Sequence, residues 1–304
     1  MAQPTLKQLS ALIAIAETGL FRTAAEKLHV SQPALSEQIS QLEYRLGARL
    51  LDRDRRGARL TPVGEAIAIR ARRILADVSE LDSLVRSSAE NLGGLIRMGA
   101  LPTLGPYLMP YVVPVLHARY PGLRLYVRET TGQALEDGLQ AGQYDVALTV
   151  GVTPGSKLCV LPLFEEPLKL GIAHDDPLAG RSHITAQALA GRDVLTLEDG
   201  HRLTEQVKAI ARKSGATILD DYQGTSLDGL RQMVGMGMGV SIFPQLYERS
   251  EIRNDRAVEA RPFNSADAIR KVSLIWRENN PREKDFETLG GIIAARAAEL
   301  LAEG

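Results

Sequence analysis

One short stretch near the start of the chain constrains the fold more than any other, the run Ser31-Gln32-Pro33-Ala34-Leu35-Ser36. Serine is favoured at the residue before a helix, and Pro33 fits the first helical turn, where its missing N–H leaves no hydrogen bond unmade. The run therefore predicts a helix that begins here. A short helix predicted over residues 23–28 carries Ala24 and Ala25, which are small enough for another helix to cross closely. This order of elements indicates a helix-turn-helix motif.

Glycines and apolar periodicity define the helices on either side of the turn. Gly19 ends a first amphipathic helix, and Gly47 ends the helix after the turn, as C-cap glycines do. In the last helix, spacing of i, i+4, i+7 and i+11 turns one apolar set inward: Leu35, Ile39, Leu42 and Leu46. The short polar residues at its N-terminal end then face outward, as on a recognition helix that meets base edges in the major groove.

A basic segment follows the last helix. Arginines crowd a hairpin-like sequence between residues 50 and 60, which is typical of a wing that grips DNA. Residues 1–60 contain nine Lys and Arg against six Asp and Glu, although the whole chain has a formal net charge of −1. The alternative is an ordinary three-helix segment with a solvated basic face. The joint occurrence of the alanine pair, the turn and the basic wing argues against it.

The expected DNA contacts follow from side-chain chemistry. Glutamine suits adenine, serine suits a phosphate or a base, and glutamate suits the cytosine amino group, while arginine suits phosphate or the minor groove. The residues expected to contact DNA are Thr23, Ser31, Gln32, Pro33, Ser36, Glu37, Gln38, Arg53, Arg55 and Arg56.

The run from Leu6 to Leu60, followed by Thr61-Pro62-Val63-Gly64, resembles the DNA-binding half of the LysR-type transcriptional regulators. The resemblance extends along the whole chain. It implies an all-α winged helix-turn-helix, a long linker helix that dimerises, and a two-lobed α/β effector domain like the periplasmic binding proteins. It also implies double-stranded promoter DNA and RNA polymerase as partners, a homodimer or homotetramer, and action as an activator and autoregulator.

Periodicity divides the chain after the wing. Apolar residues continue at helical spacing to about residue 90, which predicts a linker helix with a dimer seam. Asn91-Leu92-Gly93-Gly94 then predicts a hinge. The expected domains are residues 1–61 for DNA binding, 62–92 for the linker helix and hinge, and 93–304 for effector binding.

From Leu95 onward, short strands alternate with helices, which predicts an α/β module with parallel sheets. Binding-protein folds cross between their lobes twice, and we expect the crossings near residues 164–167 and 267–271. The expected lobes are lobe I (93–165 and 269–304) and lobe II (166–268).

A ligand between the lobes would lie where strand ends meet helix N-termini, whose unpaired N–H groups favour an anion. Thr103 follows a predicted strand and opens a predicted helix, and His201 lies on the turn Glu198-Asp199-Gly200-His201. Threonine or serine at a helix start is also an ordinary cap, so only a shared location at the lobe interface supports a site. The expected effector contacts are Thr103, Leu104, Thr130, Thr131, His201, Arg202, Thr225 and Ser226.

Two segments, Gly99 to Pro110 and Leu197 to His201, are similar to the peroxide-sensing OxyR branch of this family. In that branch the residue after this histidine is the peroxidatic cysteine. Here Arg202 takes this position and no cysteine follows it, so the disulfide switch is absent. The guanidinium suits a carboxylate, phosphate or sulfate effector. The alternative is a surface ion pair with Glu198, Asp199 or Glu205.

Composition limits the remaining functions. With 304 residues and 44% hydrophobic content, the chain can bury the cores of two domains, and its one cysteine excludes an intrachain disulfide. No segment resembles a signal peptide or a membrane span, so we expect a cytoplasmic protein. The five histidines show no short metal spacing and no nucleophile motif is present, so we expect neither an enzyme nor a cofactor.

Two other functions stay open from the sequence. One is a redox or constitutive regulator that acts through Cys159 or through Met233, Met236 and Met238. A lone cysteine beside a Gly- and Pro-rich loop is, however, more typical of a small buried hydrophobe. The more distant alternative is a small-molecule carrier or enzyme of binding-protein fold, which a salt-dependent DNA affinity would exclude.

We expect Gln32→Ala and Ser36→Ala to relax sequence preference, because they remove side chains that meet bases. Arg53→Ala or Arg56→Ala should weaken binding to all duplexes alike and reduce the salt slope by about one, since each removes a phosphate contact. Fluorescence anisotropy with specific and random duplexes checks both expectations. Equal losses of affinity for the two duplexes in Ser36→Ala would contradict the assigned docking.

Overall fold

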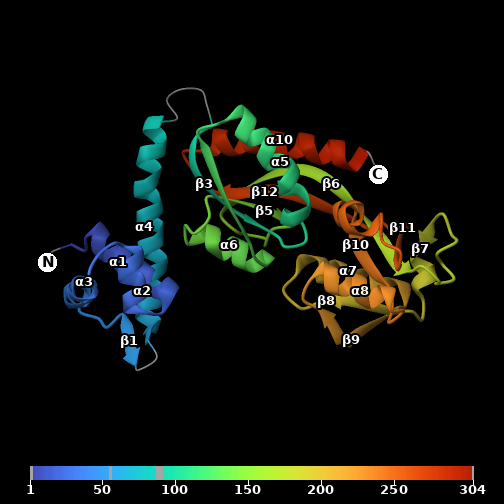
Figure 1. Cartoon of the computed structure of the whole chain (residues 1–304), viewed down its shortest axis with the longest axis horizontal. Helices are drawn as coiled ribbons and strands as arrows, with labels where there is room; N and C mark the ends of the chain where they lie inside the picture. The colour runs from blue at the N-terminus through green and yellow to red at the C-terminus, as the bar shows by residue number, and fades with distance from the viewer. Residues whose placement is uncertain (1–2, 55–56, 87–91, 303–304) are drawn as a thin grey trace. The chain divides into compact units, whose positions relative to one another are not determined.

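The computed structural model describes residues 3–54, 57–86 and 92–302, which form two compact units. The first unit holds the helices α1 to α4 and the hairpin β1–β2. The second holds the strands β3 to β12 and the helices α5 to α10 (Figure 1). The first is the expected winged helix-turn-helix with its linker helix, and the second is the expected two-lobed α/β domain.

Capping residues set the ends of the helices in the first unit. Ser31 Oγ accepts a backbone N–H of the first turn at 3.4 Å and so caps the recognition helix, as predicted. Gly19 and Gly47 end their helices with φ of +69° and +63°. The second helix begins at Phe21, two residues earlier than predicted, so Thr23 lies inside it. The helices are α1 (Leu6–Thr18), α2 (Phe21–Lys27), α3 (Gln32–Leu46) and α4 (Pro62–Arg86).

The wing is a β-hairpin fastened to the first helix by a main-chain bond. β1 (Leu51–Asp54) pairs antiparallel with β2 (Gly57–Leu60). The N–H of Ala58 donates to the carbonyl of Gly19 at 2.8 Å. Gly57 lies beside this contact with φ of +143°, and a Cβ there would lie 2.3 Å from the Gly19 oxygen. Only glycine therefore fits at this position.

An eight-stranded sheet runs through the second unit in the order β4-β3-β5-β12-β6-β11-β7, with β10 paired to β6. Its strands are β3 (Gly94–Ala100), β4 (Leu123–Glu129), β5 (Val146–Val150), β6 (Leu158–Ala173), β7 (Ile184–Thr185), β10 (Ser241–Pro244), β11 (Val258–Asn264) and β12 (Ile269–Arg277). A separate parallel pair consists of β8 (Asp193–Leu197) and β9 (Thr217–Gly224). The main helices are α5 (Gly105–Arg119), α6 (Gly132–Gln140), α7 (Arg202–Ser214), α8 (Leu227–Gly235), α9 (Gln245–Tyr247) and α10 (Glu283–Ala302).

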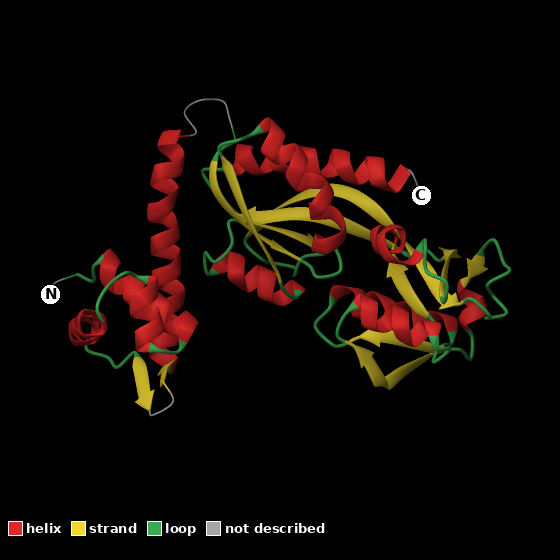
Figure 2. Ribbon diagram, in the orientation of Figure 1, coloured by secondary structure: helices red, strands yellow, loops and turns green. Residues whose placement is uncertain are grey.

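Two hydrophobic cores divide the second unit into lobes. Lobe I surrounds β3, β4 and β5, with α5 and α10 over one face of the sheet and α6 over the other (Figure 1). Lobe II packs α7 and α8 against β8, β9 and β10. β6 runs from lobe I into lobe II, and β12 pairs with it antiparallel as the chain returns to lobe I (Figure 2). The lobes are thus joined by paired strands.

One expectation for this unit is wrong, and some of its strands are not predicted. The sheet is mixed rather than parallel, because β12 returns antiparallel to both β5 and β6. The first crossing, expected near residues 164–167, lies within one continuous strand, in which Pro167 pairs with Ile269. The strands β9 and β11 have no counterpart in the prediction. β9 is largely exposed and carries the pair Asp220-Asp221, so its pattern resembles that of a loop.

A buried ion pair joins the two crossing strands. Arg270 and Glu166 are direct cross-strand partners, and Arg270 Nε donates to Glu166 Oε2 at 2.7 Å. Their side chains are 2% and 0% exposed. The other guanidinium nitrogens donate to Thr103, Nη1 to its hydroxyl at 3.1 Å and Nη2 to its carbonyl at 2.9 Å. Glu166 Oε1 accepts the Leu246 N–H at 2.8 Å. Each charged atom has a partner, as burial requires.

Glu166→Gln should lower the free energy of unfolding by about 3–5 kcal/mol, because it leaves the Arg270 charge buried without its counter-ion. Glu165→Gln on the same strand is the matched control. Glu165 pairs with Lys271 across side chains that are 60% and 81% exposed, so its loss should cost less than about 1 kcal/mol. Urea unfolding followed by circular dichroism measures both, and equal costs would contradict the role given to the buried pair.

Candidate functional site

The outward side of α3 presents the predicted base contacts on one surface of the first unit. Gln32 and Glu37 are exposed and Ser36 is half-exposed, while Leu35 and Ile39 are fully buried beneath them. The helix therefore offers amide, hydroxyl and carboxylate groups above an apolar support. The other predicted contacts of this region, all at least partly exposed, are Thr23, Ser31, Pro33 and Gln38. Arg55 and Arg56 lie outside the described residues.

Arg53 brings the wing to the recognition helix. It extends from β1, and its Nη1 donates to Ser36 Oγ at 3.3 Å. Its guanidinium carbon lies 4.7 Å from the ring centroid of Phe21. Two residues that the sequence predicts as separate DNA contacts, Arg53 and Ser36, are thus in direct contact.

Thr103 and Leu104 lie in the turn that leads into α5. Thr103 is 4% exposed, and Arg270 donates to both its hydroxyl and its carbonyl oxygen. The prediction that Thr103 opens the helix is wrong, because α5 begins at Gly105 and Leu104 occupies its N-cap position. Leu104 is fully buried in the core of lobe I.

The two lobes touch where α7 meets α6. Arg202, the first residue of α7, donates from Nη2 to Glu136 Oε1 at 2.6 Å and to Thr153 Oγ at 3.5 Å. Glu136, 6% exposed at its side chain, also accepts the Thr153 N–H at 3.1 Å. A Cβ at Gly132 would lie 2.6 Å from Arg202 Nε, so the arginine side chain packs directly against the start of α6. Arg202 reaches lobe I across this glycine. The carboxylate partner of Arg202 is thus Glu136, and not Glu198, Asp199 or Glu205 as in the alternative drawn from the sequence.

The other predicted effector residues surround this contact or cap a helix. Thr131 faces the turn before α7, since a Cβ on Gly200 would lie 3.9 Å from its methyl group. The Thr130 N–H donates to the carbonyl at the end of β3. Ser226 Oγ accepts a backbone N–H at 3.2 Å and caps α8, and Thr225 is exposed beside it. Thr131 and Arg202 therefore lie at the lobe interface, whereas Ser226 serves as the N-cap of α8.

His201 is buried at the start of α7, with 6% of its surface exposed. Burial lowers the pKa of its imidazole, and the Glu198 carboxylate, 3.9 Å from Nε2, offsets part of this effect. The imidazole is therefore neutral at neutral pH and can donate and accept one hydrogen bond each.

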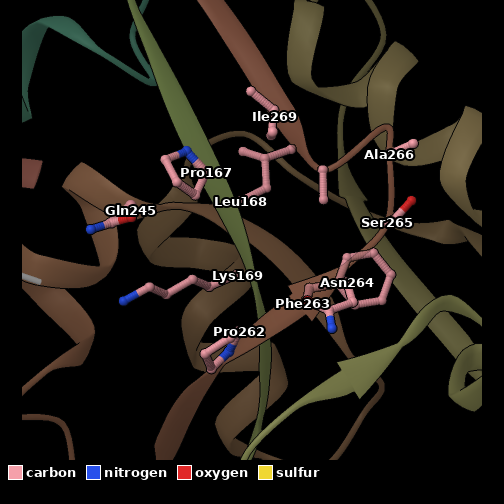
Figure 3. A pocket seen from close by; sticks show the side chains of 11 residues that line it. Pro167, Leu168, Lys169, Gln245, Pro262, Phe263, Asn264, Ser265, Ala266 and Ile269 are labelled. Atoms are coloured by element: carbon pink, nitrogen blue, oxygen red, sulfur yellow. The ribbon is translucent and has the colours of Figure 1, made fainter.

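A cavity of about 680 Å³ lies at the crossing strands (Figure 3). Buried Leu168 and Phe263 line it, together with the exposed Pro167 and Ile269. Lys169 also lines it, and its Nζ pairs with Glu248 at 2.8 Å. None of the eight predicted effector residues belongs to its lining. The cavity is therefore separate from the site that the sequence predicts.

Sequence reasoning missed the three charged partners at the lobe interface. Glu166 and Arg270 carried a usable signal, because each is a charged residue inside one of the two predicted crossings. Two segments that must lie side by side and hold opposite charges predict an ion pair. Glu136 carried no signal, since a glutamate in an amphipathic helix is ordinarily solvated.

Residues 6–65 match the model for "Bacterial regulatory helix-turn-helix protein, lysR family", and residues 89–298 match that for "LysR substrate binding domain". The chain belongs to the LysR family of transcription regulators. This regulator is 35% identical over 291 residues to the "DNA-binding transcriptional dual regulator OxyR" of Escherichia coli (strain K12), which covers 96% of this chain and 95% of that protein.

Other relatives agree. The regulator is 36% identical over 288 residues to the "Hydrogen peroxide-inducible genes activator" of Pectobacterium carotovorum subsp. carotovorum, with 95% of each chain covered. The solved structure of a full-length cysteine-to-aspartate OxyR variant from Pseudomonas aeruginosa matches with a TM-score of 0.78 and 31% identity, covering 96% of this chain and 98% of that one. The regulator is thus OxyR-like and is a DNA-binding transcription regulator rather than an enzyme.

The regulator departs from its branch in its thiol chemistry. Cys159 is its single cysteine, so the redox pair implied by the resemblance is missing. Cys159 is half-buried on β6, and burial raises the pKa of its thiol. The thiol is therefore protonated and weakly reactive at neutral pH. Across the described residues, no helix is long and apolar enough to cross a membrane, and no group of three His, Cys, Asp or Glu side chains could hold a metal ion.

Because the folded-state pKa of His201 is lowered, the unfolded chain binds a proton first as pH falls below about 6.5. Stability should therefore decrease from pH 7.5 to pH 5.5, and His201→Gln should make this decrease shallower. Urea unfolding midpoints of both proteins across the range measure the difference. Parallel pH profiles would contradict the burial effect.

Proposed function

We propose that this regulator binds promoter DNA through α3 and the wing, and that it responds to a small anionic effector held between lobes I and II. The observation that supports an anionic effector is the Arg202–Glu136 contact. It lies at the position where the resemblance implies a peroxidatic cysteine, and it joins the two lobes.

An anion fits this contact as a competitor of Glu136. Glu136 engages only Nη2 of Arg202, while Nε of the same guanidinium is buried without a hydrogen-bond partner in the described part of the chain. A carboxylate, phosphate or sulfate would satisfy Nε and Nη2 together in the bidentate geometry that guanidinium groups favour. Displacing Glu136 would release α6 from α7 and shift the population of lobe arrangements. Of the other predicted contacts, we propose only Thr131 and His201, which lie beside Arg202, because Leu104 is buried in the core of lobe I and Ser226 caps α8.

The linker helix supports a proposed homodimer. Val63, Ile74 and Val78 lie on one stripe of α4, at i, i+11 and i+15, and are 50%, 44% and 37% exposed. An apolar stripe of this kind is ordinarily covered by a second helix, here that of another copy. Assembly to a homotetramer, contact with RNA polymerase, activation, autoregulation and a cytoplasmic location rest on the family resemblance alone.

The deciding experiment is a footprint of the full-length protein on the DNA upstream of its own gene. It is run with a panel of metabolite carboxylates, phosphates and sulfate, and in parallel with hydrogen peroxide on the wild type and Cys159→Ser. A footprint shifted by an anion and unchanged by peroxide supports the proposal. A peroxide response that disappears in Cys159→Ser overturns it in favour of a thiol-based regulator.

Glu136→Gln should lower the anion concentration that half-shifts the footprint by about tenfold, because it removes the charge that competes for Arg202. Asp137→Asn is the matched control, since Asp137 lies on the same helix but is exposed and accepts from Gln133 at 3.0 Å. Titration of the footprint with the active anion measures both variants. An unchanged midpoint in Glu136→Gln would show that the anion binds elsewhere.

A further inference from the structure

Arg53 is held by three residues on two helices of the DNA-binding unit, α2 and α3. Its guanidinium lies over the ring of Phe21, the first residue of α2, at 4.7 Å from the centroid. Its Nη1 donates to Ser36 Oγ on α3 at 3.3 Å, and its Nη2 lies 3.8 Å from Glu43 Oε2 on the same helix. The side chain keeps 38% of its surface exposed. These contacts fix the orientation of the guanidinium, although part of the side chain still faces solvent.

Glu43 is itself fixed by the backbone. Its Oε1 accepts the N–H of Leu50 at 2.8 Å and of Leu51 at 3.2 Å, and its side chain is 18% exposed. Leu50 and Leu51 are 0% and 1% exposed, so these N–H groups belong to the rigid core. The carboxylate therefore cannot follow Arg53 if the arginine moves. It is a fixed anchor that directs the guanidinium toward α3.

The bond to Ser36 determines what that residue can offer to DNA. A hydroxyl that accepts a hydrogen bond from Arg53 keeps its O–H and one further lone pair, and the bond restricts the directions in which both point. In the major groove the O–H can donate to guanine N7 or O6, adenine N7 or thymine O4, and the lone pair can accept from an amino group of cytosine or adenine. Without Arg53 the hydroxyl is free to rotate, so it meets these different base edges with less preference.

We propose that Arg53 is a positioning residue for sequence recognition, which fixes the direction of the Ser36 hydroxyl and so sharpens discrimination at the base that Ser36 meets. This inference rests on the proposed docking of α3 in the major groove. It replaces the expectation that Arg53 acts only as a phosphate contact, whose loss weakens all duplexes alike. The positioning role requires the planar guanidinium that stacks on Phe21 and forks toward Ser36 and Glu43, which the point charge of lysine cannot reproduce.

The test uses the full-length protein and a duplex that the wild type selects from a random-sequence pool. Anisotropy titrations compare this duplex with its three single-base variants at the position that Ser36→Ala makes indifferent. Arg53→Lys should reduce discrimination between the preferred base and the others there about tenfold, while the slope of affinity against salt stays unchanged. In the double variant Arg53→Lys with Ser36→Ala, discrimination at this base should equal that of Ser36→Ala alone, because no hydroxyl is left for Arg53 to position.

Matched variants separate positioning from other effects. Arg59→Ala removes an exposed wing arginine on β2 and should weaken all duplexes alike. Phe21→Leu keeps an apolar side chain but removes the ring under the guanidinium, and should repeat the effect of Arg53→Lys at an unchanged melting temperature. Wild-type discrimination in Arg53→Lys, or a loss that is equal for all four bases, overturns the positioning role. Failure of the wild type to select any consensus would instead overturn the proposed DNA-binding function.

Discussion

The buried pair of Glu166 and Arg270 is the constraint on which the two-lobed domain depends. Buried charges are stable only when each of their polar atoms has a hydrogen-bond partner, so the pair constrains the positions of the groups that it contacts. It aligns β6 with β12, and through Thr103 and Leu246 it also fixes the turn before α5 and the start of α9. Apolar side chains at these two sites would pack without specifying those directions.

Two arginine–carboxylate contacts bridge the lobes, and they differ in their access to solvent. Glu166 and Arg270 are sealed at the strands, whereas Arg202 keeps 31% of its side chain exposed against Glu136. The Glu166–Arg270 pair is suited to hold the two lobes together at the crossing strands, because a dissolved ion could replace either partner only if the core opened. The second contact lies at the edge of the interface, where a dissolved ion can reach it, and it is the contact at which we propose that an anion competes.

Local features could be predicted from the sequence, and long-range ones could not. The cap at Ser31 and the terminating glycines depend on neighbouring residues, so the pattern of the chain determines them. The partner of Arg202 depends on which helix of the other lobe lies opposite. β9 was missed for the same reason, since its exposed residues carry no apolar alternation and only pairing with β8 makes it a strand. Tertiary contact, rather than local preference, decides such elements.

The attachment of the wing has a consequence for how regulators of this kind diversify. The bond from the Ala58 N–H to the Gly19 carbonyl uses main-chain atoms only, so it is indifferent to the side chains that the hairpin carries. Substitutions on the hairpin surface can accumulate while its position on the helical unit is inherited unchanged. Gly57, whose lack of a Cβ permits the approach, is the exception. A new operator preference can thus arise by exchange of exposed residues, while main-chain bonds and the buried side chains Leu51 and Ala58 hold the hairpin in place.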